Sequence, residues 1–309
     1  MHSTTKIHKS YLFGLLLIYA IMMVSCDNGK TPEGKKEKYM DAAAIERLIA
    51  HGNYDVTDRE NLARIEKKEY PFIGKYLTSS DKRIKDVALS FLRSINQPWC
   101  YRWYVSVLGD SDPQIRAGAG DGILQLKTVG NVNELLSNIE KESEQYAGDE
   151  AAMQYLIKAI GNIGKSDHVI QLKEIVNSVN TDGVEKKKIQ EALLAACAKL
   201  NDSESVHLIE KWLEMGSSVE RMKALEIVEY TEQSNWIHSV VPLLLDKSEA
   251  MSFEIGPNKV IKRVCDYAAN TLLHIDSPKK LTIDPLGPFP YTDQEIEEVK
   301  KLYGISDWQ

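Results

Sequence analysis

Two stretches decide the fold when they are compared: Leu77–Ile95, LTSSDKRIKDVALSFLRSI, and Leu108–Leu126, LGDSDPQIRAGAGDGILQL. Aligned on their first leucines, they share an aspartate at +4, an isoleucine at +7, an alanine at +11 and an aliphatic residue at +15. Partial copies follow, with Ala224 and Val228 after Leu213, and with Ala268 and Leu272 after Val264. Self-similarity of this kind is typical of proteins built from repeated supersecondary units.

The spacing within each copy is helical. In the first copy the apolar residues form one stripe of a helix at intervals of three and four: Ile84, Val87, Ala88, Phe91, Leu92 and Ile95. Asp112 followed by Pro113 indicates a helix start, with the aspartate as N-cap. We assign the shared alanine to a close helix–helix contact. Because one helix pair cannot bury its apolar stripe alone, the units are expected to stack.

The second stretch resembles a HEAT repeat of the short, phycobilisome-lyase-like kind. Ala159–Asp167, AIGNIGKSD, resembles the end of the second helix in such repeats, and the resemblance covers about Phe72 to Ile275. It implies an all-α fold, a right-handed α-solenoid of HEAT-like helix pairs, which we place at residues 39–281. The sequence predicts helix throughout this range, with a longer insert at Ser248–Asn258 before the fourth copy. The resemblance specifies a fold and says little about function.

The N-terminus has the pattern of a bacterial lipoprotein signal peptide, residues 1–25. Lys6 and Lys9 precede the uncharged run Tyr11–Val24, which is too short to span a bilayer comfortably. Met23–Cys26 resembles a lipobox, which implies lipidation of Cys26 and cleavage before it. A polar tether is expected at residues 26–38. These features predict a chain that is lipid-anchored to a membrane of the bacterial cell envelope and faces the periplasm or the cell exterior.

The C-terminal region, residues 282–309, begins with the proline-rich stretch Asp284–Pro290, which ends the helical pattern. Thr292-Asp-Gln-Glu295 has the pattern of a capping box, so a last helix is expected to run to about Leu302 and to cap the stack.

Composition narrows the classes of function. The net charge of -7 disfavours nonspecific binding to nucleic acid, which requires clustered cations. Cys100, Cys197 and Cys265 are widely spaced within helical patterns, and we expect buried thiols instead of disulfides. The sequence therefore predicts that the protein binds no nucleic acid, no metal and no cofactor.

Three motifs suggest other chemistry. Ala159–Ser166 fits a relaxed phosphate-loop pattern, but helical spacing precedes it where a strand is needed. Gly118, Gly120 and Gly122 do not form a dinucleotide fingerprint, and close helix packing accounts for them better. His207-x-x-Glu210 offers two ligands, whereas a zinc site needs three or four.

Five residues are candidates for a binding surface. Lys85, Arg116 and Arg221 share the +8 position of their copies. They form either an ion-pair ladder between neighbouring units, with Asp81 and Asp112 as partners, or a basic stripe for an acidic partner. Trp99 and Trp103 lie in an aromatic cluster after Pro98, which is either core or a binding platform.

No catalytic motif accompanies these patterns. The predicted function is a noncatalytic, membrane-tethered scaffold or protein-binding module that binds an unidentified protein partner. The alternative is an enzyme, or an enzyme accessory subunit, whose site is assembled from dispersed residues.

Overall fold

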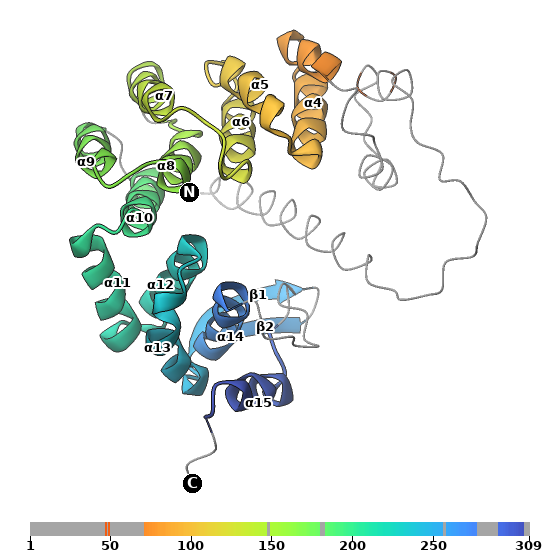
Figure 1. Ribbon diagram of the computed structural model, residues 1–309. Coiled ribbons are helices and arrows are strands. Elements are labelled where there is room, and N and C mark those ends of the chain that lie inside the picture. The colour runs from red at the N-terminus through yellow and green to blue at the C-terminus, as the bar shows by residue number, and fades with distance from the viewer. Residues whose placement is uncertain are drawn as a thin grey trace, which may run out of the picture. The chain divides into compact units, whose positions relative to one another are not determined.

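The computed structural model describes residues 47, 49, 71–146, 149–179, 183–255, 258–276 and 290–305 (Figure 1). These residues are mostly helical, which confirms the predicted all-α class. They divide into two compact units, one ending at Ser205 and the other beginning at Val206. The predicted signal peptide, Cys26, the tether and most of the proline-rich stretch lie outside the described residues.

The first unit is a two-layered stack of helix pairs. One layer is a row in which α4 packs on α6, α6 on α8 and α8 on α10, and each of these helices also packs against the element that precedes it in the other layer. The elements in chain order are η2 (Pro71–Thr78), α4 (Lys82–Ile95), η3 (Pro98–Cys100), α5 (Tyr101–Ser106), α6 (Pro113–Gln125), α7 (Val132–Gln145), α8 (Met153–Ile163), α9 (His168–Ser178) and α10 (Gly183–Lys199).

The second unit is built around α14, which packs on α12, α13, η5 and α15. Its last helix, α15, starts after Thr292, and the Thr292 and Glu295 side chains form the capping box that the sequence indicates. The elements are α11 (Ser203–Met215, which begins just before the unit), α12 (Ser218–Thr231), η4 (Ser234–Trp236), α13 (Ile237–Val240), η5 (Val241–Leu245), β1 (Glu249–Ile255), β2 (Asn258–Arg263), α14 (Val264–Ile275) and α15 (Asp293–Leu302).

The repeated alanines occupy the helix contacts. Ala88, Ala119, Ala224 and Ala268 are all fully buried, in α4, α6, α12 and α14. The aliphatic residues four positions later are buried as well. This burial confirms the predicted repeat register. Asp81 and Asp112 cap α4 and α6 by accepting a hydrogen bond from the backbone two residues on.

The glycines of α6 allow close packing, as the sequence predicts. A Cβ atom on Gly120 would lie 3.1 Å from Cβ of Tyr155 and 3.2 Å from the carbonyl oxygen of Ala152. A Cβ atom on Gly122 would lie 2.5 Å from the ring of Tyr104. Helix α6 therefore gives up helical propensity in exchange for close contacts with its neighbours.

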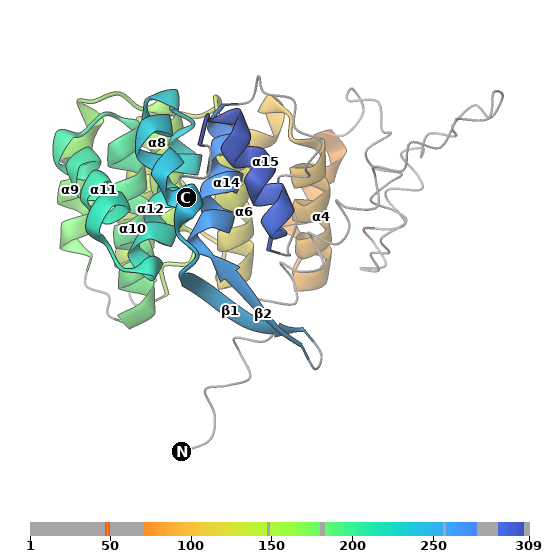
Figure 2. The ribbon, with the colours of Figure 1, turned by 90° about the horizontal axis from the view of Figure 1, so that it is seen from below.

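The prediction of helix throughout residues 39–281 is wrong at one place. Strands β1 and β2 form an antiparallel pair, which we call the hairpin, and it extends away from α12 and α14 (Figure 2). Met251, Phe253 and Ile255 alternate with polar residues in β1, and Phe253 lies opposite Val260 of β2. This alternation has the period of a strand, and the insert is too short for the pattern to stand out beside the long helical repeats.

The cysteines of the described residues form no disulfides. Cys100, Cys197 and Cys265 are free and buried, as expected, and burial raises the pKa of each thiol to about 11. Among the described residues, no helix combines the length and the apolarity that a membrane span requires.

Candidate protein-binding surface

The three cations predicted at the +8 repeat position all form ion pairs with acids that follow 25 or 26 residues later. Lys85 pairs with Asp110, Arg116 with Glu142, and Arg221 with Asp246. The acids therefore differ from the predicted partners. Asp81 instead pairs with Arg83, and Asp112 pairs with Lys82, because both aspartates are held at helix N-termini by their capping role.

Arg116 is the most deeply buried of these cations, with a side chain that is 0% exposed. Its Nε atom donates to Glu142 Oε1 at 3.1 Å, and its terminal nitrogens donate to the backbone carbonyls of Asp110, Ser111 and Asp149. The guanidinium carbon lies 3.6 Å from the centre of the Tyr146 ring. Arg116 thus ties the start of α6 to α7 and to the segment before α8.

Arg221 has a structural role of a different kind. It donates to Asp246, which also accepts hydrogen bonds from the backbone and side chain of Ser248. The backbone carbonyls of Asp246 and Ser248 accept from the amides of Cys265 and Val264. Burial opposes ionisation of Asp246, but the bonds from Ser248 and Arg221 lower its pKa overall. Arg221 therefore stabilises the base of the hairpin.

The predicted aromatic candidates lie beside the core of the first unit. Trp99 and Trp103 are half-buried and pack against the buried cluster that contains Tyr104. The indole Nε1 of Trp103 is buried and finds no hydrogen-bond partner among the described residues. The outer side of the Trp103 ring is covered in part by Arg102, whose guanidinium carbon lies 5.0 Å from the ring centre.

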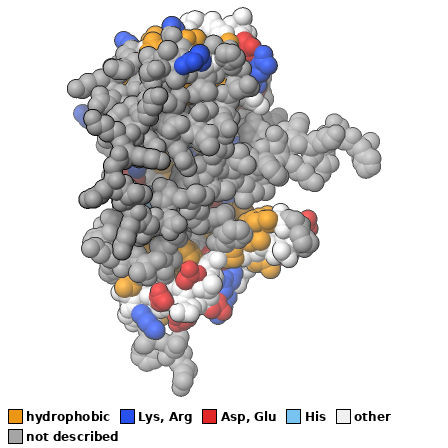
Figure 3. Space-filling view, turned by 90° about the vertical axis from the view of Figure 1, so that its right-hand side faces the viewer, with side chains coloured by type: hydrophobic (Ala, Val, Ile, Leu, Met, Phe, Trp, Pro, Cys, Tyr) orange, Lys and Arg blue, Asp and Glu red, His pale blue; other side chains and the backbone are white. Residues whose placement is uncertain are grey.

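The hairpin presents a group of apolar side chains that the helix packing of the second unit leaves partly or largely exposed. Met251 is 42% exposed and Ile261 is 39% exposed, while Phe253, Ile255 and Val260 are half-buried. Figure 3 shows hydrophobic side chains gathered over the hairpin, with charged side chains beside them. Grouped apolar side chains on a protruding element are typical of an interaction site.

Contacts at its base hold the hairpin in place. The Tyr267 hydroxyl of α14 lies 3.7 Å from the sulfur of Met251, and Lys262 Nζ lies 5.7 Å from the centre of the Tyr267 ring. Burial raises the pKa of Tyr267 to about 12 and lowers that of Lys262. The base of the hairpin is therefore packed against α14.

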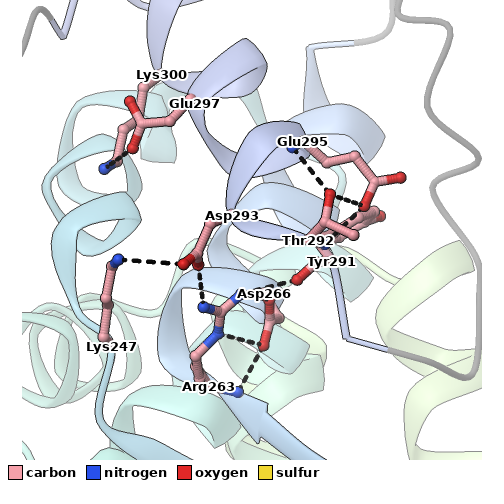
Figure 4. A network of polar contacts seen from close by, with 9 residues as sticks. All are labelled: Lys247, Arg263, Asp266, Tyr291, Thr292, Asp293, Glu295, Glu297 and Lys300. Atoms are coloured by element: carbon pink, nitrogen blue, oxygen red, sulfur yellow. Dashed lines mark hydrogen bonds and ion pairs between the residues drawn. The ribbon is translucent and has the colours of Figure 1, made fainter.

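A polar network joins the end of β2 to α14 and α15 (Figure 4). Arg263 donates to Asp266 at 2.9 Å, to Asp293 at 2.5 Å and to the carbonyl of Tyr291 at 2.8 Å. Lys247 lies 3.7 Å from Asp293. Because Arg263 contacts both helices, the network holds the end of β2 in place against α14 and α15.

Sequence reasoning missed the hairpin as a candidate site. The run of Met251, Phe253 and Ile255, followed by Val260 and Ile261 beyond two turn-forming residues, could have indicated it. The five residues that the sequence did single out lie in other elements, and Arg221 alone among them belongs to the same compact unit as the hairpin.

The other motifs give no chemistry in the described part of the chain. Ala159–Ile163 belongs to helix α8, so the phosphate-loop pattern lacks its strand, as the sequence indicates. His207 and Glu210 lie 3.8 Å apart, and no group of three potential metal ligands occurs among the described residues. A cleft of about 180 Å³ beside α9 and α10 is lined by aliphatic residues (Val176, Val179, Ile189 and Leu193) and by polar ones (Asn177, Lys186 and Gln190).

Comparison with known proteins adds a distant likeness. No protein-family model matches the chain, and no curated protein matches it significantly. Among solved structures, the complex of CpcE and CpcF of phycocyanin lyase from Nostoc sp. PCC7120 is similar with a TM-score of 0.46 and 12% sequence identity, over 90% of this chain and 99% of that chain. Because the TM-score is below 0.5, we transfer no property of that complex to this chain.

Proposed function

We propose that this protein is a noncatalytic helical-repeat scaffold that binds a protein partner through the hairpin. The observation that carries the proposal is the exposure of Met251 and Ile261 on an element inserted into the repeat pattern. A repeat unit needs no hairpin to pack on its neighbours, and only the base of this one is needed to join η5 to α14. Exposed apolar side chains with charged side chains beside them suit a protein interface.

Truncation of the hairpin tests this function. Met251 and Lys262 lie opposite each other, so two glycines can join them in place of residues 252–261. We expect the variant to fold, because the contacts of Tyr267, Arg263 and Asp246 remain. We expect it to lose the partner that the parent captures by crosslinking and affinity purification from native membranes.

Substitution of Ile170 provides the matched control. Ile170 is 66% exposed on α9, so Ile170→Ser removes an exposed aliphatic side chain without touching the hairpin. This variant should retain the partner. Equal recovery of the partner by the truncated chain and the parent would show that the hairpin is not the binding element.

The proposed location is a bacterial membrane, to which the chain is anchored by lipid on Cys26. The support is the sequence pattern alone, the apolar run that ends in Ser25-Cys26. Two acyl chains on the mature N-terminus would anchor a globular protein stably. We expect Cys26→Ser to abolish incorporation of a fatty-acid probe in growing cells, and unchanged labelling of this variant would exclude lipidation at Cys26.

A further inference from the structure

We propose that the outer edge of β2 accepts an extended segment of the partner as a third strand, and that acidic and apolar residues alternate in this segment. The inference rests on the proposed function, since it specifies what binds the hairpin. Its three supports are the absence of a third strand beside the hairpin among the described residues, the distribution of charge between the strands and the positions of Val260 and Lys259 on opposite faces of β2.

Among the described residues, no third strand pairs with the hairpin. In the described residues the sheet contains β1 and β2 alone, so the backbone groups on the outer side of each strand have no third strand to pair with. Such edges bind extended peptides by strand addition. On β2, Asn258 is exposed, Lys259 is 57% exposed and Ile261 is 39% exposed.

The two strands carry opposite charge. Strand β2 contains Lys259, Lys262 and Arg263 and no acid, whereas β1 contains Glu249 and Glu254 and no base. Within the hairpin, Lys259 pairs with Glu249 at 3.5 Å. A strand added beside β2 would lie next to Lys259, as β1 does, but on the opposite edge of β2. The charge of β2 therefore favours an acidic segment.

The side chains on the two faces of β2 differ, and this difference predicts that acidic and apolar residues alternate in the added segment. Val260 shares a face with Phe253, its neighbour in β1, and Lys259 and Ile261 point to the other face. An added strand would place apolar residues beside Val260 and acids beside Lys259. Alternate side chains of the segment would thus have different surroundings, which gives the edge a preference for sequence as well as for charge.

Two other occupants fit the charges less well. In a symmetric dimer of hairpins, β2 would pair with β2, or β1 with β1, which places like charges side by side. An anionic membrane surface would attract the cations of β2 but repel Glu249 and Glu254 of β1. A protein segment that is acidic and extended meets neither difficulty.

Binding of a synthetic peptide to the full-length chain in detergent tests the proposal. The probe is a peptide about as long as β2 in which glutamate alternates with valine, and its affinity is followed by fluorescence anisotropy. We expect saturable binding and slower hydrogen exchange of the β2 amides. We also expect that N-methylation of one alternate set of amides, the set that faces β2, abolishes binding, whereas N-methylation of the other set leaves binding largely intact, because an added strand pairs through one edge only. A peptide with lysine in place of glutamate should bind more weakly.

Charge reversal on the protein supplies the control pair. Lys259→Glu should weaken binding of the glutamate peptide by about threefold to tenfold, as expected for reversal of one cross-strand charge pair. Lys301→Glu, the same change at an exposed position on α15, should leave it unaltered. Equal affinity of the chain for the unmodified peptide and for both N-methylated peptides would overturn the proposal, and so would equal affinity for the lysine peptide. Hairpin-dependent binding to phosphatidylglycerol vesicles, or hairpin-dependent self-association, with no binding of the glutamate peptide would also overturn it.

The outcomes separate this inference from the function on which it rests. If hairpin truncation abolishes capture of the native partner but the glutamate peptide does not bind, strand addition is wrong and the scaffold function stands. If the truncated chain still captures the partner, the proposed function itself is wrong.

Discussion

Replacement of Arg116 by methionine is expected to lower the free energy of unfolding by about 3–5 kcal/mol at neutral pH, because it leaves the buried Glu142 carboxylate without its cation. Glu142 is 2% exposed and keeps one other bond, from the amide of Ala152. Three backbone carbonyls lose their donor in the same variant. Urea melts measure the loss.

The loss should shrink as the pH falls. Burial raises the pKa of Glu142 even though Ala152 and Arg116 act against it, and removal of Arg116 raises that pKa further. An acid whose pKa is higher in the folded state binds more protons there than in the unfolded chain. The unfolded state is the same in both chains, so the full deficit of the variant relative to the parent is present above the folded pKa of Glu142 in the variant, and it shrinks as the pH falls from that pKa to the lower folded pKa of Glu142 in the parent.

Lys82→Met is the control for this experiment. Lys82 also forms an ion pair between repeat units, with Asp112, but the two side chains are 43% and 27% exposed. Its loss should cost less than about 1 kcal/mol, as is usual for exposed pairs. An equal loss of unfolding free energy in the two variants would contradict the claim that Arg116 stabilises the fold as a buried ion pair. A loss in the Arg116 variant that does not change with pH would contradict it as well.

Gly122→Ala is the second substitution with a large expected effect. On an open helix the change would stabilise by about 1 kcal/mol. Here the new Cβ would lie 2.5 Å from the ring of Tyr104, which is itself fully buried and cannot move aside freely. We therefore expect a net loss of about 1–3 kcal/mol from overpacking, measured by urea melts.

Gly118→Ala tests whether the effect comes from packing or from the helix itself. Position 118 lies on the same helix, but there the new Cβ would approach the tip of the Leu89 side chain at 3.3 Å, and this tip can rotate. This variant should be neutral or slightly more stable than the parent. Equal changes in the free energy of unfolding for the two alanine variants would contradict the close contact between α6 and α5.

Much of the fold follows from local patterns in the sequence. The alanine at +11 predicts a helix contact because only a small side chain lets two backbones approach, and Ala88 and Ala119 are indeed fully buried. Asp112-Pro113 and Thr292–Glu295 predict helix starts because capping depends on residues that are adjacent in the chain. Features set by neighbouring residues were therefore predictable.

The candidate surface was less predictable, because it depends on which segments meet in space. The shared +8 position indicated an ion-pair ladder as one alternative, and Lys85, Arg116 and Arg221 do form ion pairs. Their acids, however, come from loops and a second helix and are not the aspartates that the sequence suggested. The hairpin was missed because a two-stranded insert is short beside four helical copies. Exposure of Ile261, which makes the hairpin a candidate, is a property of the folded chain.

Site-specific photocrosslinking in native cells tests the central claim, that the hairpin binds a protein partner, most directly. A benzophenone amino acid placed at Ile261 should give one discrete crosslinked product, because this exposed position lies on β2. The same amino acid at Ile170, which is more exposed but lies on α9, should give none. A product at Ile170 with none at Ile261 would contradict the assignment of the hairpin as the binding surface.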